Sequence, residues 1–151
     1  MTKGLILVLI TLLIISCAKN DERVQLTASY FELNECFSTM SLRGAEVVIT
    51  DQNSYQEFQD SIQRHFYDYC DTVSLPEINF EESMFLGVYT QTSGCSTQYL
   101  RSVYYSEENN TYDYEVSVIQ EGLCEMLITS FNCAIIPKQS DSEVVNFKVS
   151  Y

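Results

Sequence analysis

The sequence predicts an α+β fold that is mostly β, an antiparallel sheet or sandwich with one packed α-helix at about residues 54–66. Apolar and polar residues alternate along most of the chain, which is typical of strands with one buried face. One stretch instead repeats its apolar residues at helical spacing. The 151 residues contain no internal repeat and only two prolines, so a single domain is expected.

Six segments are predicted to be strands because β-branched and aromatic residues dominate them. They are 46–50, 84–90, 98–105, 112–118, 127–136 and 145–151. Residues 84–89 include few polar side chains, so this strand is expected to lie centrally with both faces covered. Residues 106–110 are polar and separate two strands, which indicates a hairpin loop.

The predicted helix begins with Ser54 and Glu57, which match a capping box in which each side chain binds a backbone amide of the first turn. The apolar residues of the helix share one face. They are Tyr55, Phe58, Ile62 and Phe66. This face is expected to pack on the core rather than bind a partner.

The first residues predict export from the cell. Lys3 supplies a positive charge, an apolar run extends over 5–15, and Ser16 precedes Cys17, which is the order of a signal peptide. The run is shorter than the roughly 20 apolar residues of a membrane-spanning helix. The cysteine resembles that of the lipobox of bacterial lipoproteins, and an ordinary secretory signal is the alternative.

The lipobox resemblance implies that residues 1–16 are removed and that Cys17 is diacylglycerated and N-acylated, for example with palmitate. Residues 17–23 are then a lipidated tether, and 24–151 form the single β-rich domain. Several acyl chains hold a protein stably, since each buried methylene contributes about 0.8 kcal/mol. Lys19–Glu22 resembles the acidic surface-export signal of Bacteroidota lipoproteins. An outer-membrane location is expected, with the periplasmic or the cell-surface face left open.

The formal net charge is −13, and it becomes −14 when Lys3 is removed, with 7 basic against 21 acidic residues. An acidic surface repels phosphate backbones and anionic lipid headgroups, and the sequence has no basic stripe. Nucleic acid is therefore not an expected partner. The lipid, rather than electrostatic attraction, is expected to hold the protein at a membrane.

Five cysteines follow Cys17, and in an exported chain cysteines are expected to pair. They are Cys36, Cys70, Cys95, Cys124 and Cys133. Cys95 and Cys124 each follow closely on a glycine beside a predicted strand, so they are the first disulfide candidate. Cys36–Cys70 is the second, which leaves Cys133 as a small hydrophobic residue in a strand. No pair has redox or zinc-knuckle spacing, so neither a metal nor a cofactor is expected.

No catalytic constellation is found in the sequence, and the chain is predicted not to be an enzyme. His65 is the only conventional base, and it is expected at a surface or rim. The acidic pairs 81–82 and 107–108 consist of neighbours that point apart, so solvated charge is favoured over a glycosidase pair or a calcium site. Tyrosines could form a binding surface, although half-buried sheet positions are the alternative.

A set of short motifs across residues 46–138 follows a recognisable order. They are the strand 46–50, the helix with Tyr55 and Phe58, Leu75-Pro76-Glu77-Ile78-Asn79-Phe80, Leu86-Gly87-Val88-Tyr89, the Ser93-Gly94-Cys95 turn and Ile135-Ile136-Pro137-Lys138. This order resembles the PrcB family, whose members are exported lipoproteins and domains associated with a protease complex. The residues that carry over are Pro76, Phe80, Gly87, Gly94, Pro137 and Lys138. Asn79 replaces the family's Asp, and Gly94-Cys95-Ser96 replaces its Gly-Gly-Tyr.

The PrcB resemblance implies an accessory role, in which the protein binds and stabilises an outer-membrane subtilisin-like protease complex without catalysing a reaction. We therefore expect a lipid-anchored, non-catalytic envelope protein that acts by protein–protein contact. The candidate interface consists of Ser93, Gly94, Ser96, Tyr99, Tyr104 and Tyr105. The alternative is a surface glycan-binding or adhesive lipoprotein, which needs exposed aromatic side chains around a shallow groove. An enzyme would need a pocket that gathers His65 with two carboxylates.

Overall fold

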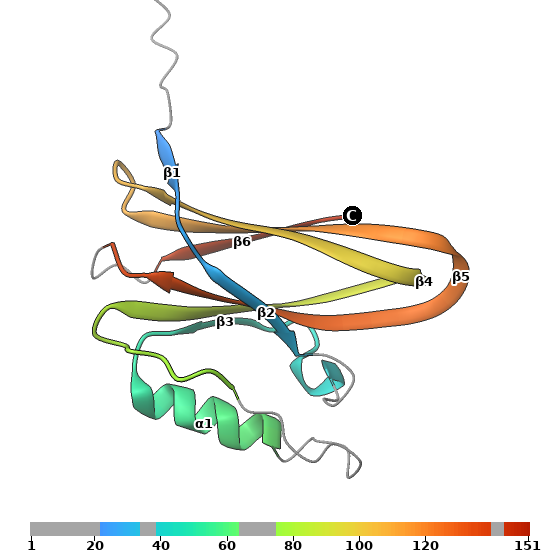
Figure 1. Cartoon of the computed structure of the whole chain (residues 1–151), viewed down its shortest axis with the longest axis horizontal. Helices are drawn as coiled ribbons and strands as arrows, with labels where there is room; N and C mark the ends of the chain where they lie inside the picture. The colour runs from blue at the N-terminus through green and yellow to red at the C-terminus, as the bar shows by residue number, and fades with distance from the viewer. Residues whose placement is uncertain (1–21, 34–38, 64–74, 140–143) are drawn as a thin grey trace, which may run out of the picture.

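The structure is a computed structural model that describes residues 22–33, 39–63, 75–139 and 144–151. It confirms the predicted fold class, a six-stranded, mostly antiparallel sheet with one packed α-helix (Figure 1). The helical elements are the 3-10 helix η1 (Thr39–Leu42) and the helix α1 (Gln52–Gln63). The strands are β1 (Arg23–Gln25), β2 (Ser29–Leu33), β3 (Glu46–Ile49), β4 (Ser83–Ser106), β5 (Thr111–Pro137) and β6 (Val145–Ser150).

β4 and β5 form one long antiparallel hairpin that folds over onto itself (Figure 1). Their pairing runs from Ser83 opposite Pro137 to Ser106 opposite Thr111. The first half of β4 and the second half of β5 also pair with β3 and β2, and together they form the lower layer of Figure 1. The other halves pair with β1 and, in parallel, with β6, and they form the upper layer. The two layers are therefore joined by the bend in the hairpin.

The alternating sequence pattern predicts four separate strands where the structure has only β4 and β5. The difference arises at the bend, where exposed polar residues and two glycines interrupt the alternation while the backbone ladder continues. The predicted hairpin loop is confirmed, because β4 ends at Ser106 and β5 begins at Thr111. β1 and β2 are too short to produce a clear alternating pattern, and the sequence does not predict them.

Two apolar clusters fill the spaces between the layers. The cluster between the two sheet layers includes Met84, Leu86, Val88, Val103, Tyr105, Tyr112, Tyr114, Val116, Ala134 and Ile136. The cluster between the lower layer and α1 includes Phe85, Tyr89, Phe131 and Cys133 with Tyr55, Phe58 and Ile62. Alternate residues of β4 contribute to the two clusters. The segment 84–90 is therefore buried on both faces, as predicted.

Gly87 leaves room for an aromatic ring in the second cluster. A Cβ atom at this position would lie 2.3 Å from Cε1 and 2.5 Å from Cζ of Phe131. Phe131 is fully buried, and its ring centroid lies 5.9 Å from that of Phe58 on α1. The absent side chain at Gly87 thus lets β4 and β5 support the ring on which the helix rests.

Helix α1 begins at Gln52, two residues before the predicted start at Ser54. Asp51 is the capping residue, because its Oδ1 accepts a hydrogen bond from the backbone N–H of Ser54 at 2.9 Å and its Oδ2 accepts one from the Ser54 hydroxyl at 2.7 Å. These hydrogen bonds lower the pKa of Asp51. Tyr55, Phe58 and Ile62 are buried as expected, and Phe66 lies outside the described residues.

The N-terminal strand β1 extends into the segment that the sequence assigns to the tether. Arg23 pairs with Ser106 in the upper layer, and its guanidinium lies 2.9 Å from a carboxylate oxygen of Asp113 and 3.0 Å from one of Glu115. Arg23 therefore belongs to the folded domain, and the tether can extend no further than Glu22. Among the described residues, no helix has the length and apolarity to span a membrane.

Asp113 is the centre of a charged cluster on the outer face of the upper layer. Lys148 Nζ donates a hydrogen bond to Asp113 at 2.7 Å, and the Asn146 amide donates another at 2.9 Å. Burial raises the pKa of Asp113, but the hydrogen bonds from Lys148, Asn146 and Arg23 outweigh burial and lower the pKa below its ordinary value. The carboxylate thus links β1, β5 and β6.

We expect the Asp113→Asn substitution to destabilise the protein by about 1–2 kcal/mol at neutral pH, because the half-exposed Lys148 and Arg23 lose a charge-assisted acceptor. A lowered folded-state pKa stabilises the fold above the unfolded-state pKa of about 3.9, and this stabilisation is lost as the pH falls through the folded-state value. Urea unfolding at pH 7 and pH 3 should therefore show a smaller acid effect in the variant. An equal acid effect in both proteins would contradict this role.

Candidate functional site

The bend of the β4–β5 hairpin is the most distinctive part of the described structure. Gly94 pairs with Met126 and Ser96 pairs with Glu121, so residues 122–125 of β5 stand opposite the single residue Cys95. Extra residues on one strand form a bulge that redirects the chain and displays its side chains. The bend thus lets one hairpin serve two layers and projects part of β5 into solvent.

A disulfide holds the bend closed. Cys95 and Cys124 are bonded with a Cα–Cα distance of 4.7 Å, which confirms the first pair predicted from the sequence. Gly122 has φ of +77° and lies against this bond, since a Cβ atom at Gly122 would be 2.4 Å from Cys95 Sγ. Glycine at position 122 is therefore required both by the backbone conformation and by the space that the disulfide occupies.

The outer surface of the bend presents large apolar side chains to solvent. We call Ile119, Leu123 and Met126 the apolar tip, because their exposed fractions are 41%, 102% and 56%. Glu121 and Glu125, both exposed, lie between them in the sequence. The three residues belong to one segment of β5 at the bend, and large exposed apolar side chains that lie near one another can mark an interaction surface.

The apolar tip lies at the opposite end of the molecule from β1 (Figure 1). Arg23 pairs with Ser106, and the bend begins ten residues earlier in β4, at Ser96. At about 3.3 Å per residue, roughly 30 Å separate β1 from the bend. The chain therefore leads into the domain at one end and displays the apolar tip at the other.

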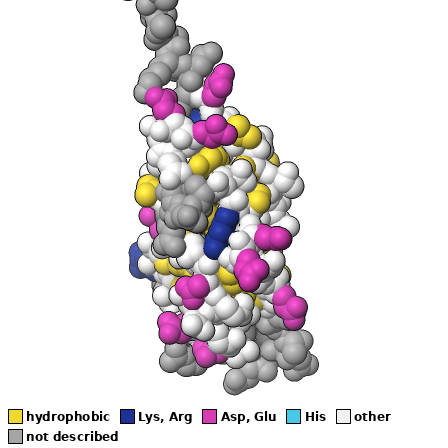
Figure 2. Space-filling model, turned by 90° about the vertical axis from the view of Figure 1, so that its left-hand side faces the viewer, with side chains coloured by type: hydrophobic (Ala, Val, Ile, Leu, Met, Phe, Trp, Pro, Cys, Tyr) yellow, Lys and Arg dark blue, Asp and Glu magenta, His cyan; other side chains and the backbone are white. Residues whose placement is uncertain are grey.

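The end of the molecule opposite the bend is acidic. Acidic side chains outnumber lysine and arginine side chains on the face that Figure 2 shows. The pairs 81–82 and 107–108 belong to the turns at the two ends of the folded hairpin, and all four glutamates are exposed. These positions agree with the prediction that the pairs are solvated.

The tyrosines of the predicted interface do not share one surface. Tyr105 is only 8% exposed and belongs to the core between the layers, and Tyr99 packs against the same core. Tyr104 lies on the opposite face of β4 from these two tyrosines, because successive side chains of a strand alternate between its faces. The Arg23 guanidinium lies 5.2 Å from the centroid of the Tyr104 ring. The interface prediction is therefore wrong for Tyr105, because residues 99 and 105 have the same inward orientation as the core residue Val103.

The serines and the glycine of the predicted interface lie in the bend itself. Ser93 and Ser96 are exposed, whereas Gly94 is buried. The Ser96 hydroxyl donates a hydrogen bond to a carboxylate oxygen of Glu121 across the hairpin at 2.8 Å. The structure therefore brings the predicted turn next to the apolar tip, which the sequence reasoning did not identify. Four large apolar residues between Ile119 and Leu127, around Gly122 and Cys124, were the available signal.

The residues that carry the family resemblance support the fold at the helix end of the lower layer. The Tyr55 hydroxyl donates to the Pro76 carbonyl at 2.9 Å, and burial raises the pKa of Tyr55 to about 12, so it remains a donor at neutral pH. Lys138 Nζ donates to the Phe80 carbonyl at 2.6 Å. Asn79 Oδ1 accepts from the backbone N–H of Glu81 at 3.1 Å, as an aspartate oxygen could. These contacts position a segment rather than a reacting group.

A buried polar network lies between the layers on the side towards the bend. Arg101 donates from Nε to Asn132 Oδ1 at 2.8 Å and from a terminal nitrogen to Glu32 at 3.2 Å. Asn132 is fully buried, and its amide donates to the Thr90 hydroxyl at 2.9 Å. The sequence reasoning missed this network, although Arg101 has the inward orientation of Val103 in the same strand. The space between the layers is thus apolar towards the hairpin loop and polar towards the bend.

The remaining candidate residues show no gathered reactive groups. Cys133 is free and buried, and burial raises the pKa of its thiol, so the thiol stays protonated and acts as a small core residue, as predicted. Cys17, Cys36, Cys70 and His65 lie outside the described residues. In the part of the chain that the structure describes, no three His, Cys, Asp or Glu residues come together as metal ligands.

Comparison with known proteins gives no relative from which a role could be transferred. No protein family model, no curated protein and no solved structure matches this chain. The resemblance to the PrcB family therefore remains a prediction from short motifs. Function has to be inferred from the arrangement of the chain's own residues.

Proposed function

We propose that this protein is a lipid-anchored, non-catalytic component of a bacterial envelope that acts by binding another protein through the apolar tip. The exposure of Leu123 carries the proposal, because covering a fully exposed leucine with a partner is favourable, and Ile119 and Met126 are exposed in the same segment of β5. The Cys95–Cys124 disulfide supports it, since a constrained bend loses less conformational freedom on binding.

The position of the tip suits such a role. A lipid on Cys17 would hold the β1 end near the membrane, and the apolar tip would then point away from it, where a neighbouring protein can be reached. The acidic surface disfavours insertion of the protein into anionic lipid. An accessory or stabilising role in an exported protease complex or another envelope complex, as the PrcB resemblance implies, fits this geometry.

Replacement of the tip residues should abolish the complex without unfolding the protein. We expect the Leu123→Ser and Met126→Ser double variant, pulled from gently solubilised envelopes, to lose the protein that co-purifies stoichiometrically with the native chain. Buried apolar side chains of this size contribute about 1.5–3 kcal/mol each, so the affinity should fall by more than about tenfold. Val24→Ser is the matched control, because Val24 is 54% exposed in β1 at the other end.

An unchanged set of co-purifying proteins in the tip variant, or recovery of the native chain alone after mild crosslinking, would contradict the proposal. The anchor is tested separately with Cys17→Ser. This variant should lose incorporation of labelled palmitate and be released from the membrane fraction when the apolar tip is also replaced, and continued incorporation of the label would rule out lipidation at Cys17.

A further inference from the structure

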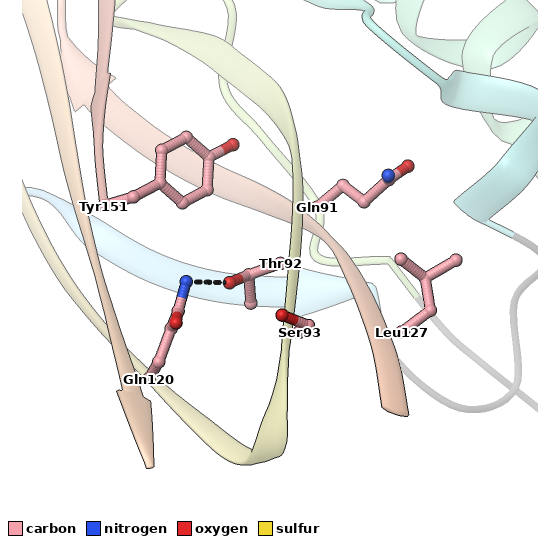
Figure 3. Close-up of a pocket in the computed structure, with 6 residues that line it drawn as sticks. All are labelled: Gln91, Thr92, Ser93, Gln120, Leu127 and Tyr151. Atoms are coloured by element: carbon pink, nitrogen blue, oxygen red, sulfur yellow. Dashed lines mark hydrogen bonds between the residues drawn. The ribbon is translucent and has the colours of Figure 1, made fainter. Parts of the chain in front are cut away.

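A pocket of about 340 Å³ lies beside the bend, at the mouth of the space between the two layers (Figure 3). It is lined by Gln91, Thr92 and Ser93 of β4, Gln120 and Leu127 of β5, and Tyr151. Its volume is at the low end of the about 300–1,000 Å³ range of ligand pockets, which suits a small ligand or the end of a longer one. The pocket adjoins the apolar tip but shares none of its three residues.

The pocket walls offer hydrogen bonds but no charge. The Gln120 amide donates to the Thr92 hydroxyl, which fixes both side chains and leaves the Gln120 carbonyl oxygen as an acceptor (Figure 3). In Figure 3 the Gln91 side chain points away from Gln120 and Tyr151, and its Oε1 accepts from the Tyr89 hydroxyl at 3.1 Å. The donors beside Gln120 are therefore the hydroxyl groups of Ser93 and Tyr151, which can also accept. A ligand in this pocket would therefore meet donors and acceptors side by side, as the hydroxyl groups of a sugar require.

Two exposed apolar side chains border the pocket, on opposite sides of β4 in Figure 3. Tyr151 is 67% exposed and Leu127 is 61% exposed, so the ring of Tyr151 is accessible from solvent beside Gln120. An aromatic ring with a polar tip can pack on the C–H face of a pyranose while its hydroxyl forms a hydrogen bond. This combination of one exposed ring, amides and hydroxyls suits an amphipathic, polyhydroxylated ligand.

Charge decides which such ligand the pocket can hold. None of the six lining residues is ionisable at neutral pH, so an anionic or cationic group would be desolvated there without a counter-ion. The chain also has a net charge of −13, which repels anionic ligands in general. Uronic acids, sialic acids and phosphorylated sugars are disfavoured for both reasons.

Polar groups buried near the pocket agree with a hydrophilic occupant. Thr97 stands opposite Gln120 in the hairpin register, and its hydroxyl is buried with no hydrogen-bond partner among the described residues. The Tyr99 hydroxyl is also buried without a hydrogen-bond partner among the described residues. This half of the space between the layers therefore contains polar groups that the described residues leave without hydrogen bonds.

From this geometry, we propose that the pocket lined by Gln91, Gln120 and Tyr151 binds one or two residues of a neutral saccharide. The site is independent of the protein contact at the apolar tip, because Tyr151 and Gln120 do not belong to the tip. The ligand is either a free oligosaccharide or the end of a neutral surface glycan, since both present the same hydroxyl and C–H faces.

The test uses the full-length protein on an array of neutral hexose and N-acetylhexosamine oligosaccharides, with uronic, sialylated and sulfated glycans beside them. We expect binding to neutral glycans only. The affinity for the best neutral oligosaccharide, measured by calorimetry, should fall by about tenfold in Tyr151→Ala and by less than about threefold in Tyr151→Phe, which keeps the ring. Gln120→Ala should also bind more weakly, whereas Leu123→Ser should bind as the native chain does.

Amide shifts in NMR titration of the native chain should be confined to residues 91–93, 120 and 127 and the C-terminus. Preference for acidic glycans, shifts elsewhere on the molecule, equal affinity of the two Tyr151 variants or no binding of any neutral glycan would each overturn the proposal. Comparing short oligosaccharides with the intact polysaccharide separates a free sugar from a surface glycan as the ligand. Loss of the protein partner in the tip variant with glycan binding intact would separate this site from the proposed protein contact.

Discussion

Removal of the Cys95–Cys124 disulfide should lower the free energy of unfolding by about 3–4 kcal/mol, which is the loop-closure cost of a sequence separation of 29 residues. For a domain of this size, the melting temperature should fall by roughly 10 °C. The expected effect is large because the disulfide holds the one place where the ladder between β4 and β5 is interrupted. Without it, residues 122–125 stand opposite Cys95 with no covalent restraint.

This expectation is measured by thermal and urea unfolding of the Cys95→Ala and Cys124→Ala double variant under oxidising conditions. Limited proteolysis should cleave the double variant first within 122–125, since cleavage follows local opening. The Cys133→Ala variant controls for the loss of a thiol outside the bend, and its bend should remain resistant. A double variant that melts at the native temperature would show that the strand pairing alone fixes the bend.

Replacement of Gly87 by alanine should destabilise the protein by about 1–3 kcal/mol, and replacement by valine should cost more. The added Cβ would lie 2.3 Å from Phe131 Cε1, and this ring is fully buried against Phe58 and cannot move aside freely. The lower conformational entropy of the unfolded alanine variant, worth about 0.4–1 kcal/mol, offsets only part of this cost.

A double-mutant cycle with Phe131→Leu isolates the steric contact between Gly87 and Phe131. Leucine removes the ring atoms that the new Cβ would meet, so the Gly87→Ala and Phe131→Leu variant should be more stable than the sum of the single effects predicts. Urea unfolding of the four proteins gives the coupling energy. Additive effects would show that the conformational preference of glycine, rather than the ring, accounts for its presence.

The fold class could be predicted because its main signals are local. Alternation along 84–90 and 112–118 and the helical spacing of Tyr55, Phe58 and Ile62 each report which face of an element is buried. The Cys95–Cys124 pair could be predicted because both cysteines lie beside glycines at interruptions of the strand pattern. In these cases the information lies within about ten residues of the sequence.

The features that escaped prediction depend on contacts between distant residues. The continuity of β4 through the bend depends on its pairing with β5, and the polar network depends on Arg101 meeting Asn132 across the two layers. The cap of α1 depends instead on two neighbouring candidates for the same role. Ser54 and Asp51 are both residue types that cap helices, and Asp51 is the cap because its carboxylate accepts two hydrogen bonds from Ser54.

The path of β4 determines how the domain would respond to mechanical load. β1 pairs antiparallel with the last residues of β4, and in Figure 1 it runs steeply across the long dimension of the molecule. Tension between the N-terminal end and the bend would therefore pass through the few hydrogen bonds of β1 into β4. Because the single strand β4 passes from the β1 end to the bend, its covalent backbone would transmit the force between the two ends of the protein.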